Sequence, residues 1–284
     1  MKHHDGWTES DDGHQLYFQR WQPDDPPRAA LLFVHGLSEH SGRYTHVMRY
    51  FAARDFDCWA VDYRGHGRSP GLRVHVDRFD DYVEDVAAGF RLVRAKHALL
   101  PLFLVGHSQG GLVTLRYALI HSQGLNGIVV SSPFLRVHPE SAPPAALQMV
   151  ANIISTFVPT LMFNKSAEPH RLSRDPAVGQ AYTDDPLVSS SVTARWFTSL
   201  LKAQADTRQR ASELDIPALI MQSGADQLVD PKTTREWAAS APADLVQFEE
   251  WHGFYHEMFN ELDKERVFER VEAWLDERLA SIDS

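Results

Sequence analysis

Residues 102–120 read L-F-L-V-G-H-S-Q-G-G-L-V-T-L-R-Y-A-L-I. The first four residues, 102–105, form an unbroken apolar run, which is typical of a strand buried on both faces of a parallel sheet. Further along, Leu112, Leu115 and Leu119 recur at helical spacing. The stretch therefore predicts a buried strand that passes directly into a helix.

The junction between this strand and this helix is the pentapeptide G-H-S-Q-G at 106–110. Such an abrupt turn requires a strained backbone at the serine and small flanking residues, and it lifts the serine hydroxyl to where a base can reach it. Gly111 lets the helix pack closely behind the turn. Ser108 is therefore predicted to be a nucleophile, with the backbone amide of Gln109 as one donor of an oxyanion hole.

The overall composition limits the class of protein. A chain of 284 residues with 43% hydrophobic and 23% charged residues has an ordinary globular balance. Its net charge of -10 disfavours nucleic-acid partners, because phosphate binding requires a basic surface. Cys58 is the single cysteine, which excludes an intrachain disulfide and a cysteine metal cluster. With no apolar signal segment and no membrane-spanning run, we expect a soluble cytoplasmic protein.

Apolar runs and helical periodicities alternate along the chain on either side of this stretch. Two segments of alternating polarity around the turn at 11–13 predict an antiparallel hairpin. The alternation of strand and helix forces crossover connections and therefore a mostly parallel sheet. The predicted strands are 6–9, 15–21, 29–34, 57–61, 102–105, 128–132, 218–221 and 245–248, and the predicted helices of this part are 44–54, 79–97, 110–120, 231–241 and 264–282.

The alternation breaks between residues 134 and 211. This segment has several prolines and at least two helical patterns, at 145–158 and 192–209, but no short apolar strand. We therefore predict an α/β fold in which a helical cap, residues 134–211, is inserted between strands of a core that comprises residues 1–133 and 212–284.

A serine nucleophile requires a base and an acid that orients the base, both on loops at the carboxyl ends of the strands. The order Ser, acid, His that is usual in this architecture leaves His252 and His256 as candidate bases. His256 lies beyond a glycine turn and can begin an anchoring helical turn, which favours it over His252. Asp226 follows a predicted strand through a tight turn, whereas Asp230 precedes a proline, as a helix cap does.

The second oxyanion donor must come from the loop after the first buried strand, which is H-G-L at 35–37. Leu37 would supply its backbone amide to the developing charge. We expect His35 to brace this loop by side-chain hydrogen bonds. We expect His107 to have a structural role on the far side of the serine turn.

A set of short motifs runs through the chain from about residue 6 to its end: H-G followed by S-E-H-S-G-R-Y (35–36 and 38–44), D-Y-R-G-H-G-R-S (62–69), G-H-S-Q-G-G (106–111), G-A-D with V-D-P (224–226 and 229–231) and Y-H-E (255–257). Together they resemble the monoacylglycerol lipase and lysophospholipase branch of the α/β-hydrolase family. The block at 39–44 is the most specific part, because many α/β hydrolases share the other motifs and lack this one.

The resemblance implies a hydrolase of carboxylic esters that forms an acyl-enzyme on Ser108. It implies that Asp226 is the orienting acid and His256 the base, and that no metal and no cofactor takes part. The oxyanion amides would be those of Leu37 and Gln109.

In that family the residues that match Glu39 and Arg43 lie near the polar head of the substrate. The family usually has a small residue after His-Gly and often methionine after the serine. Leu37 and Gln109 depart from this pattern. These departures do not change the implied roles, but the motifs then do not define the shape of the pocket.

The first predicted cap helix carries the information on the substrate. It is apolar nearly all round, with one narrow polar stripe of Gln148, Asn152 and Ser155. Two interpretations remain open: the helix packs into a small cap core, or it lines an acyl-chain tunnel or touches lipid. In the second interpretation Met149 and Ile153 bind the substrate, and the cap contacts a membrane surface transiently.

The first functional hypothesis is therefore hydrolysis of single-chain lipid esters such as monoacylglycerols. The alternatives are a lysophospholipase, an esterase for small or aromatic esters, and a non-catalytic binding protein of the same fold. The intact set of Ser108, Asp226 and His256 argues against the last of these.

Overall fold

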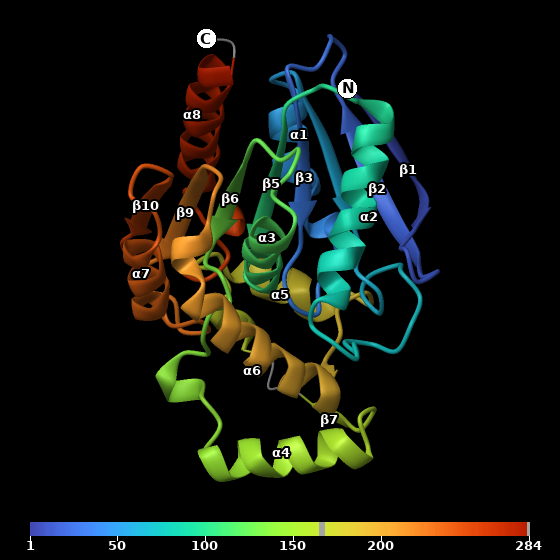
Figure 1. Cartoon of the computed structure of the whole chain (residues 1–284), viewed down its shortest axis with the longest axis vertical. Helices are drawn as coiled ribbons and strands as arrows, with labels where there is room; N and C mark the ends of the chain where they lie inside the picture. Colours follow the sequence, from blue (N-terminus) through green and yellow to red (C-terminus); the bar gives the residue numbers. More distant parts are fainter. Residues whose placement is uncertain (165–167, 283–284) are drawn as a thin grey trace.

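An eight-stranded twisted sheet forms the centre of the molecule in the computed structural model, which describes residues 1–164 and 168–282 (Figure 1). The strand order is β1-β2-β4-β3-β5-β6-β9-β10. Strand β2 pairs antiparallel with β1 and with β4, and the other neighbours pair parallel. The strands are β1 (Lys2–Glu9), β2 (Gln15–Gln22), β3 (Ala29–Val34), β4 (Phe56–Val61), β5 (Leu102–His107), β6 (Gly127–Ser131), β9 (Ala218–Ser223) and β10 (Val246–Trp251).

Helices cover both faces of this sheet (Figure 1). Helices α2, α3, α6 and α7 pack on one face, and α1 and α8 pack on the other. Side chains alternate along the central strand β3, where Leu32 and Val34 face the first group and Leu31 and Phe33 face the second. The helices of the core are α1 (Thr45–Ala52), α2 (Asp81–Lys96), α3 (Gln109–Ile120), α7 (Pro231–Ser240) and α8 (Lys264–Ile282).

The predicted α/β fold class is confirmed, and the elements expected in the core form close to their expected positions. The largest difference is at the amino end, where β1 begins at Lys2 instead of residue 6. Helix α2 begins at Asp81 instead of residue 79, because a turn precedes it, closed by a 3.0 Å hydrogen bond from the Asp81 amide to the Arg78 carbonyl.

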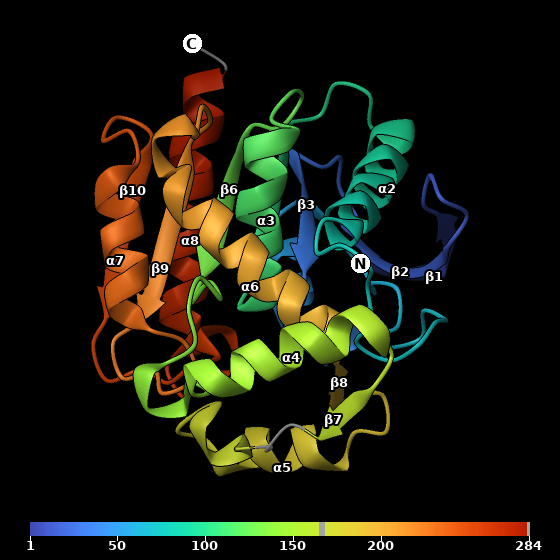
Figure 2. The same ribbon diagram turned by 60° about the horizontal axis from the view of Figure 1, so that its bottom comes forward.

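The segment between β6 and β9 lies across the carboxyl ends of the parallel strands (Figure 2). Two strands pair there as an antiparallel ribbon, and neither is of the short apolar kind whose absence from this segment the sequence indicates. Each has three residues, and β7 is exposed, so neither produces the apolar run by which buried strands are recognised. The elements of this segment are α4 (Ala145–Phe157), β7 (Met162–Asn164), α5 (Pro176–Asp184), β8 (Ser191–Thr193) and α6 (Ala194–Gln209).

This inserted segment leaves and re-enters the sheet at adjacent strands, since Ile128 of β6 pairs with Ala218 of β9. The division of the chain into a core and a cap at residues 133 and 211 stays a prediction. Short 3-10 turns connect several elements: η1 (Ser41–Tyr44), η2 (Pro139–Ser141), η3 (Pro169–Arg171), η4 (Ala211–Glu213) and η5 (Met258–Asn260). In the described ranges 1–164 and 168–282, no helix combines the length and the apolar character needed to cross a membrane.

Candidate active site

Ser108 stands at the sharp turn between strand β5 and helix α3. Its backbone has φ 54° and ψ -119°, a conformation that costs a residue other than glycine roughly 1–3 kcal/mol. The packing explains the flanking glycines: a methyl group on Gly106 would lie 2.2 Å from Thr114 Oγ1, and one on Gly110 would lie 2.0 Å from the Val34 carbonyl oxygen. The turn expected around the serine therefore forms only with these small neighbours.

Ser108, His256 and Asp226, the predicted triad, are joined by hydrogen bonds. His256 Nε2 lies 2.8 Å from Ser108 Oγ, and His256 Nδ1 lies 2.7 Å from Asp226 Oδ2. When Nδ1 donates its proton to the carboxylate, Nε2 is left to accept the proton of the serine hydroxyl. The other carboxylate oxygen, Asp226 Oδ1, accepts the amides of Leu228 at 2.8 Å and Val229 at 3.0 Å. These bonds fix the orientation of the carboxylate whose other oxygen meets His256.

Burial and charge act in opposite directions on the ionisation of this pair. Burial lowers the pKa of His256, but the carboxylates of Asp226, Glu257 and Glu39 together raise it by more, so that this pKa stands above its ordinary value of 6.5. Burial raises the pKa of Asp226, and the imidazole and two backbone amides lower it by more, to below its ordinary value. Asp226 is therefore ionised at neutral pH, and His256 gains basicity from it.

Asp230 and His252, the alternative acid and base, lie away from the triad. Asp230 is the N-cap of α7, where it accepts the Lys232 amide at 3.1 Å and the Thr233 hydroxyl at 2.7 Å. The His252 side chain is 90% exposed on the turn that follows β10. Neither residue is placed to serve as the acid or the base.

The loop after β3 lies against the nucleophile. Leu37 lines the same cavity as Ser108, and a methyl group on Gly36 would lie 3.4 Å from Ser108 Cβ. His35 Nε2 accepts the Tyr63 amide at 3.2 Å, so His35 Nδ1 carries the proton and donates it to the Gly36 carbonyl at 2.9 Å. His35 thus braces the loop through its side chain, as expected.

The two predicted oxyanion amides have no hydrogen-bond acceptor among the described residues. Within the part of the chain that the structure describes, the amide of Leu37 has no hydrogen-bond acceptor. Gln109 is the first residue of α3, and the first amides of a helix have no acceptor within it. The neighbouring amide of Gly36 differs, because it donates to Glu39 Oε1 at 2.6 Å. The role of Leu37 and Gln109 as donors to an oxyanion at Ser108 stays a prediction.

Glu39, Arg43 and Glu257 form a buried charged cluster beside the triad. Arg43 bridges the two carboxylates, with two hydrogen bonds of 2.7 Å to Glu257 and one short hydrogen bond to Glu39. Burial raises the pKa of Glu39, but Arg43, His107, His35 and the Tyr44 hydroxyl together lower it by more, to about 2. The Tyr44 hydroxyl also donates to Glu39, at 2.7 Å. With one guanidinium against two carboxylates, the cluster carries a formal negative charge next to His256.

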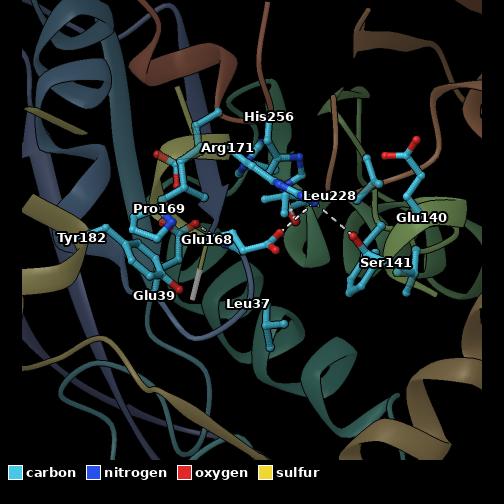
Figure 3. Close-up of a pocket in the computed structure, with 18 residues that line it drawn as sticks. Leu37, Glu39, Glu140, Ser141, Glu168, Pro169, Arg171, Tyr182, Leu228 and His256 are labelled. Carbon is cyan, nitrogen blue, oxygen red and sulfur yellow. Dashed lines mark hydrogen bonds and ion pairs between the residues drawn. The ribbon is translucent and has the colours of Figure 1, made fainter. Parts of the chain in front are cut away.

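A cavity of about 500 Å³ lies over Ser108, between the core and the inserted segment (Figure 3). Arg171 crosses its wall, with Nη1 at 2.8 Å from Glu168 Oε2 and 3.2 Å from Ser141 Oγ. In the described residues, no three His, Cys, Asp or Glu side chains are arranged to hold a metal ion. The apolar lining residues are Leu37, Phe134, Val137, Pro169, Leu172, Leu228 and Val229, and the charged ones include Glu39, Glu140, Glu168, Arg171 and Glu257.

Comparison with known proteins identifies the family. The family model described as serine aminopeptidase, S33, matches residues 25–263. The chain belongs to this family of α/β hydrolases. The hydrolase is 31% identical to a monoacylglycerol lipase of Mycolicibacterium smegmatis over 93% of each chain. It is 30% identical to the phospholipase YtpA of Bacillus subtilis, over 90% of this chain and 98% of the relative.

A solved structure agrees with these relationships. The crystal structure of a monoacylglycerol lipase from Paleococcus ferrophilus, 28% identical to this hydrolase, matches it with a TM-score of 0.83. The match covers 93% of this chain and 99% of that chain. The resemblance inferred from the sequence motifs is therefore confirmed at the level of family and fold.

Met149 and Ile153 do not line the cavity of this hydrolase. Their side chains are 67% and 57% exposed, on helix α4, which lies at the end of the molecule farthest from the sheet (Figure 1). The opposite side of α4 packs on α6, where Ser155 Oγ lies 2.8 Å from Thr198 Oγ1. This corrects the expectation that the two side chains line a substrate tunnel. Contact of this outer side with lipid stays a prediction.

Two residues beside the triad were misplaced or overlooked from the sequence. The ring of His107 was expected on the far side of the turn, but it lies 4.8 Å from the His256 ring and lines the cavity. Burial, and then the neighbouring His256, lower the pKa of His107 to about 4, so it is neutral at pH 7. Glu257 follows the predicted base directly, and its place in the Y-H-E motif is the signal that could have revealed it.

Proposed function

We propose that this hydrolase cleaves the carboxylic esters of single-chain lipids, with monoacylglycerols as the substrate class, through an acyl-enzyme on Ser108. The observation that carries the proposal is the hydrogen-bonded chain from Ser108 through His256 to Asp226, which faces a cavity with apolar side chains in its wall. The names of the relatives support the same class, since one is a monoacylglycerol lipase and another a phospholipase.

In the first half of the proposed reaction, His256 Nε2 takes the proton of Ser108 Oγ while this oxygen attacks the ester carbonyl carbon. The oxyanion that forms receives hydrogen bonds from the amides of Leu37 and Gln109. His256 then donates its proton to the departing alcohol oxygen, and the acyl group stays on Ser108. In the second half, His256 takes a proton from water, the hydroxide attacks the acyl carbon, and the proton returns to Ser108 as the fatty acid leaves. Asp226 stabilises the imidazolium in both halves.

The charges around the cavity support a neutral head group. Four carboxylates line the cavity, those of Glu39, Glu140, Glu168 and Glu257, and the guanidinium of Arg171 already pairs with one of them. A phosphate group would meet net negative charge there, whereas glycerol hydroxyls can donate hydrogen bonds to carboxylates. We therefore favour monoacylglycerols over anionic lysophospholipids, which remain the second candidate because of the phospholipase relative.

We further propose that the enzyme meets its substrate at a lipid surface through α4. Exposed apolar side chains gather on the outer side of this helix and on the residues that follow it, and Phe157 is 80% exposed. A large exposed apolar patch is typical of an interaction surface, and a helix of 13 residues would lie in the interface and not span it. The patch comprises Leu147, Met149, Val150, Ile153, Phe157, Val158, Leu161, Met162 and Phe163. A cytoplasmic location stays a prediction, which cell fractionation would test.

The proposal can be tested with purified protein, a fluorophosphonate probe and glycerol monoesters of increasing acyl length. We expect Ser108→Ala to lose labelling and turnover, because removal of a triad residue costs on the order of a million-fold in kcat. We expect kcat/KM to rise with acyl length and to exceed that for lysophosphatidic acid with the same acyl chain.

Each alternative predicts a different result. Activity that falls with acyl length would indicate an esterase for small esters, and faster hydrolysis of the lysophospholipid would indicate a lysophospholipase. A wild-type protein that the probe does not label would indicate a binding protein. Turnover by Ser108→Ala at the wild-type rate would refute the nucleophile.

A further inference from the structure

Gln109 connects the serine turn with the inserted segment. Its backbone follows Ser108 at the start of α3, and its side chain is fully buried. Gln109 Oε1 accepts a hydrogen bond from Trp196 Nε1 at 2.9 Å. Because Trp196 belongs to α6, a single residue carries both a predicted oxyanion amide and a side-chain contact to the helices over the site.

This glutamine is not explained by stability alone. Gln109 Nε2 is buried and has no hydrogen-bond partner among the described residues, and an unsatisfied buried donor destabilises a fold. Methionine, which has a similar length, would remove that donor but would leave the buried Trp196 Nε1 without its acceptor. What the glutamine adds is the directional bond to Trp196, which fixes the orientation of residue 109.

Helix α6 connects Trp196 with the core at one point and with the outermost helix, α4, at another. Its N-cap Thr193 accepts the Trp196 amide at 3.3 Å, and the Thr193 hydroxyl donates to a core carbonyl, that of Val74, at 3.0 Å. Along its length α6 packs against α4, as the Ser155 to Thr198 contact shows. Trp196 therefore lies between the anchored start of α6 and the part that carries the outermost helix.

We propose that Gln109 is a positioning residue through which α6 sets the geometry of the oxyanion hole. The hydrogen bond from Trp196 holds the side chain of Gln109 and, with it, the peptide whose amide faces the oxyanion. When the bond is lost, this amide loses its fixed direction, so stabilisation of the transition state falls while ground-state binding of the substrate is retained. The inference rests on the proposed ester hydrolysis and adds a role for two side chains.

The test compares the full-length wild type with Trp196→Phe, Gln109→Met and the double variant. Trp237→Phe is the matched control, because Trp237 Nε1 also donates at 2.9 Å, to the Thr207 carbonyl near the other end of α6, and its side chain is as well buried. Kinetics are measured on p-nitrophenyl butyrate, a soluble ester that needs no lipid surface, and Tm is measured for every variant.

We expect Trp196→Phe and Gln109→Met each to lower kcat about tenfold and to leave KM within about twofold. Complete loss of an oxyanion donor costs roughly 100- to 1,000-fold, and here the donor is loosened but present. The double variant should lose no more than either single variant, because both substitutions remove the same bond. Trp237→Phe should lower Tm by a similar amount and keep the wild-type kcat.

Wild-type kcat in both single variants would overturn the proposal, as would a loss in the double variant equal to the product of the single losses. An equal loss of kcat in Trp237→Phe would also overturn it, since the effect would then follow general destabilisation. A wild type that hydrolyses no ester would overturn the proposed function as well. An active wild type with unaffected variants would overturn this inference alone.

Discussion

Replacement of Gly110 by alanine tests how closely helix α3 must approach strand β3. The added methyl carbon would lie 2.0 Å from the Val34 carbonyl oxygen and 2.4 Å from the His35 carbonyl oxygen. Both neighbours are backbone atoms at the end of β3, and ordinary contacts of this kind are longer by roughly 1 Å or more. The start of α3 must therefore move away from β3 by about 1 Å.

A movement of α3 away from β3 would separate predicted site groups on α3 from those on the loop after β3. Ser108 and the amide of Gln109 move with α3, whereas the amide of Leu37 stays with β3. A misplacement of about 1 Å costs roughly 100-fold in rate, and overpacking costs roughly 1–3 kcal/mol. We therefore expect Gly110→Ala to lower kcat/KM for a soluble ester by about 100-fold and the free energy of unfolding by about 2 kcal/mol.

The assay combines ester hydrolysis with urea unfolding. Gly89→Ala is the matched control, because Gly89 is also a helical glycine that faces the sheet, but its nearest neighbours are side-chain carbons of Val61 at 3.0 Å and Leu32 at 3.3 Å, which can shift. We expect this control to keep the wild-type kcat/KM. If Gly110→Ala has wild-type activity and stability, the approach of α3 to β3 is not what positions the nucleophile, and the reasoning is refuted.

Further substitutions test individual residues. kcat/KM should fall as the pH drops through the pKa of His256, because only the neutral imidazole accepts a proton, and the carboxylates of Asp226, Glu257 and Glu39 hold this pKa above 6.5. In Asp226→Asn the acidic limb of the pH profile should move to lower pH and kcat should fall about 10,000-fold; an unmoved limb would contradict this assignment. Asp230→Ala should lower the free energy of unfolding by about 0.5–2 kcal/mol in thermal melts and keep kcat, because Asp230 caps α7; a stable but inactive variant would make it part of the site. His252→Ala should keep at least about a tenth of the wild-type kcat, a difference of about 1.4 kcal/mol in the barrier, whereas His256→Ala should be inactive; the reverse result would show the base to be misassigned. Ile153→Glu should slow hydrolysis of monoacylglycerol in vesicles and leave hydrolysis of a soluble ester unchanged; an equal loss on both substrates would argue against a lipid-binding face.

The parallel sheet and the meeting of the triad residues could be predicted because both depend on local signals. An apolar run such as 102–105 marks a strand buried on both faces, and the glycines around Ser108 mark an abrupt passage from strand to helix. In such a sheet the site lies at the carboxyl ends of the strands. Asp226 and His256 each follow a strand at that edge, in the chain order expected of the acid and the base. These inferences require no knowledge of how distant helices pack.

The arrangement of the inserted segment could not be predicted in the same detail. It depends on how helices pack on one another, and their apolar residues do not mark a single buried side. Helix α4 is apolar nearly all round, so its sequence does not say which side faces α6, and Met149 and Ile153 prove to be exposed. The ring of His107 contacts that of His256, a residue far away in the chain, so no local pattern indicates its direction. The contact between Gln109 and Trp196 joins residues far apart in the chain and leaves no local signal.

The inserted segment leaves the sheet at the carboxyl end of β6 and re-enters it at the amino end of the neighbouring parallel strand β9. The entropy of closing a loop grows slowly with its length, so that each doubling costs only about 0.6 kcal/mol. Segments of very different size can therefore be grafted at this point at little thermodynamic cost, while Ser108, Asp226 and His256 stay on the scaffold that surrounds it. Substrate range in this architecture can thus evolve by exchange of one contiguous piece of the gene, while the three triad residues are inherited unchanged.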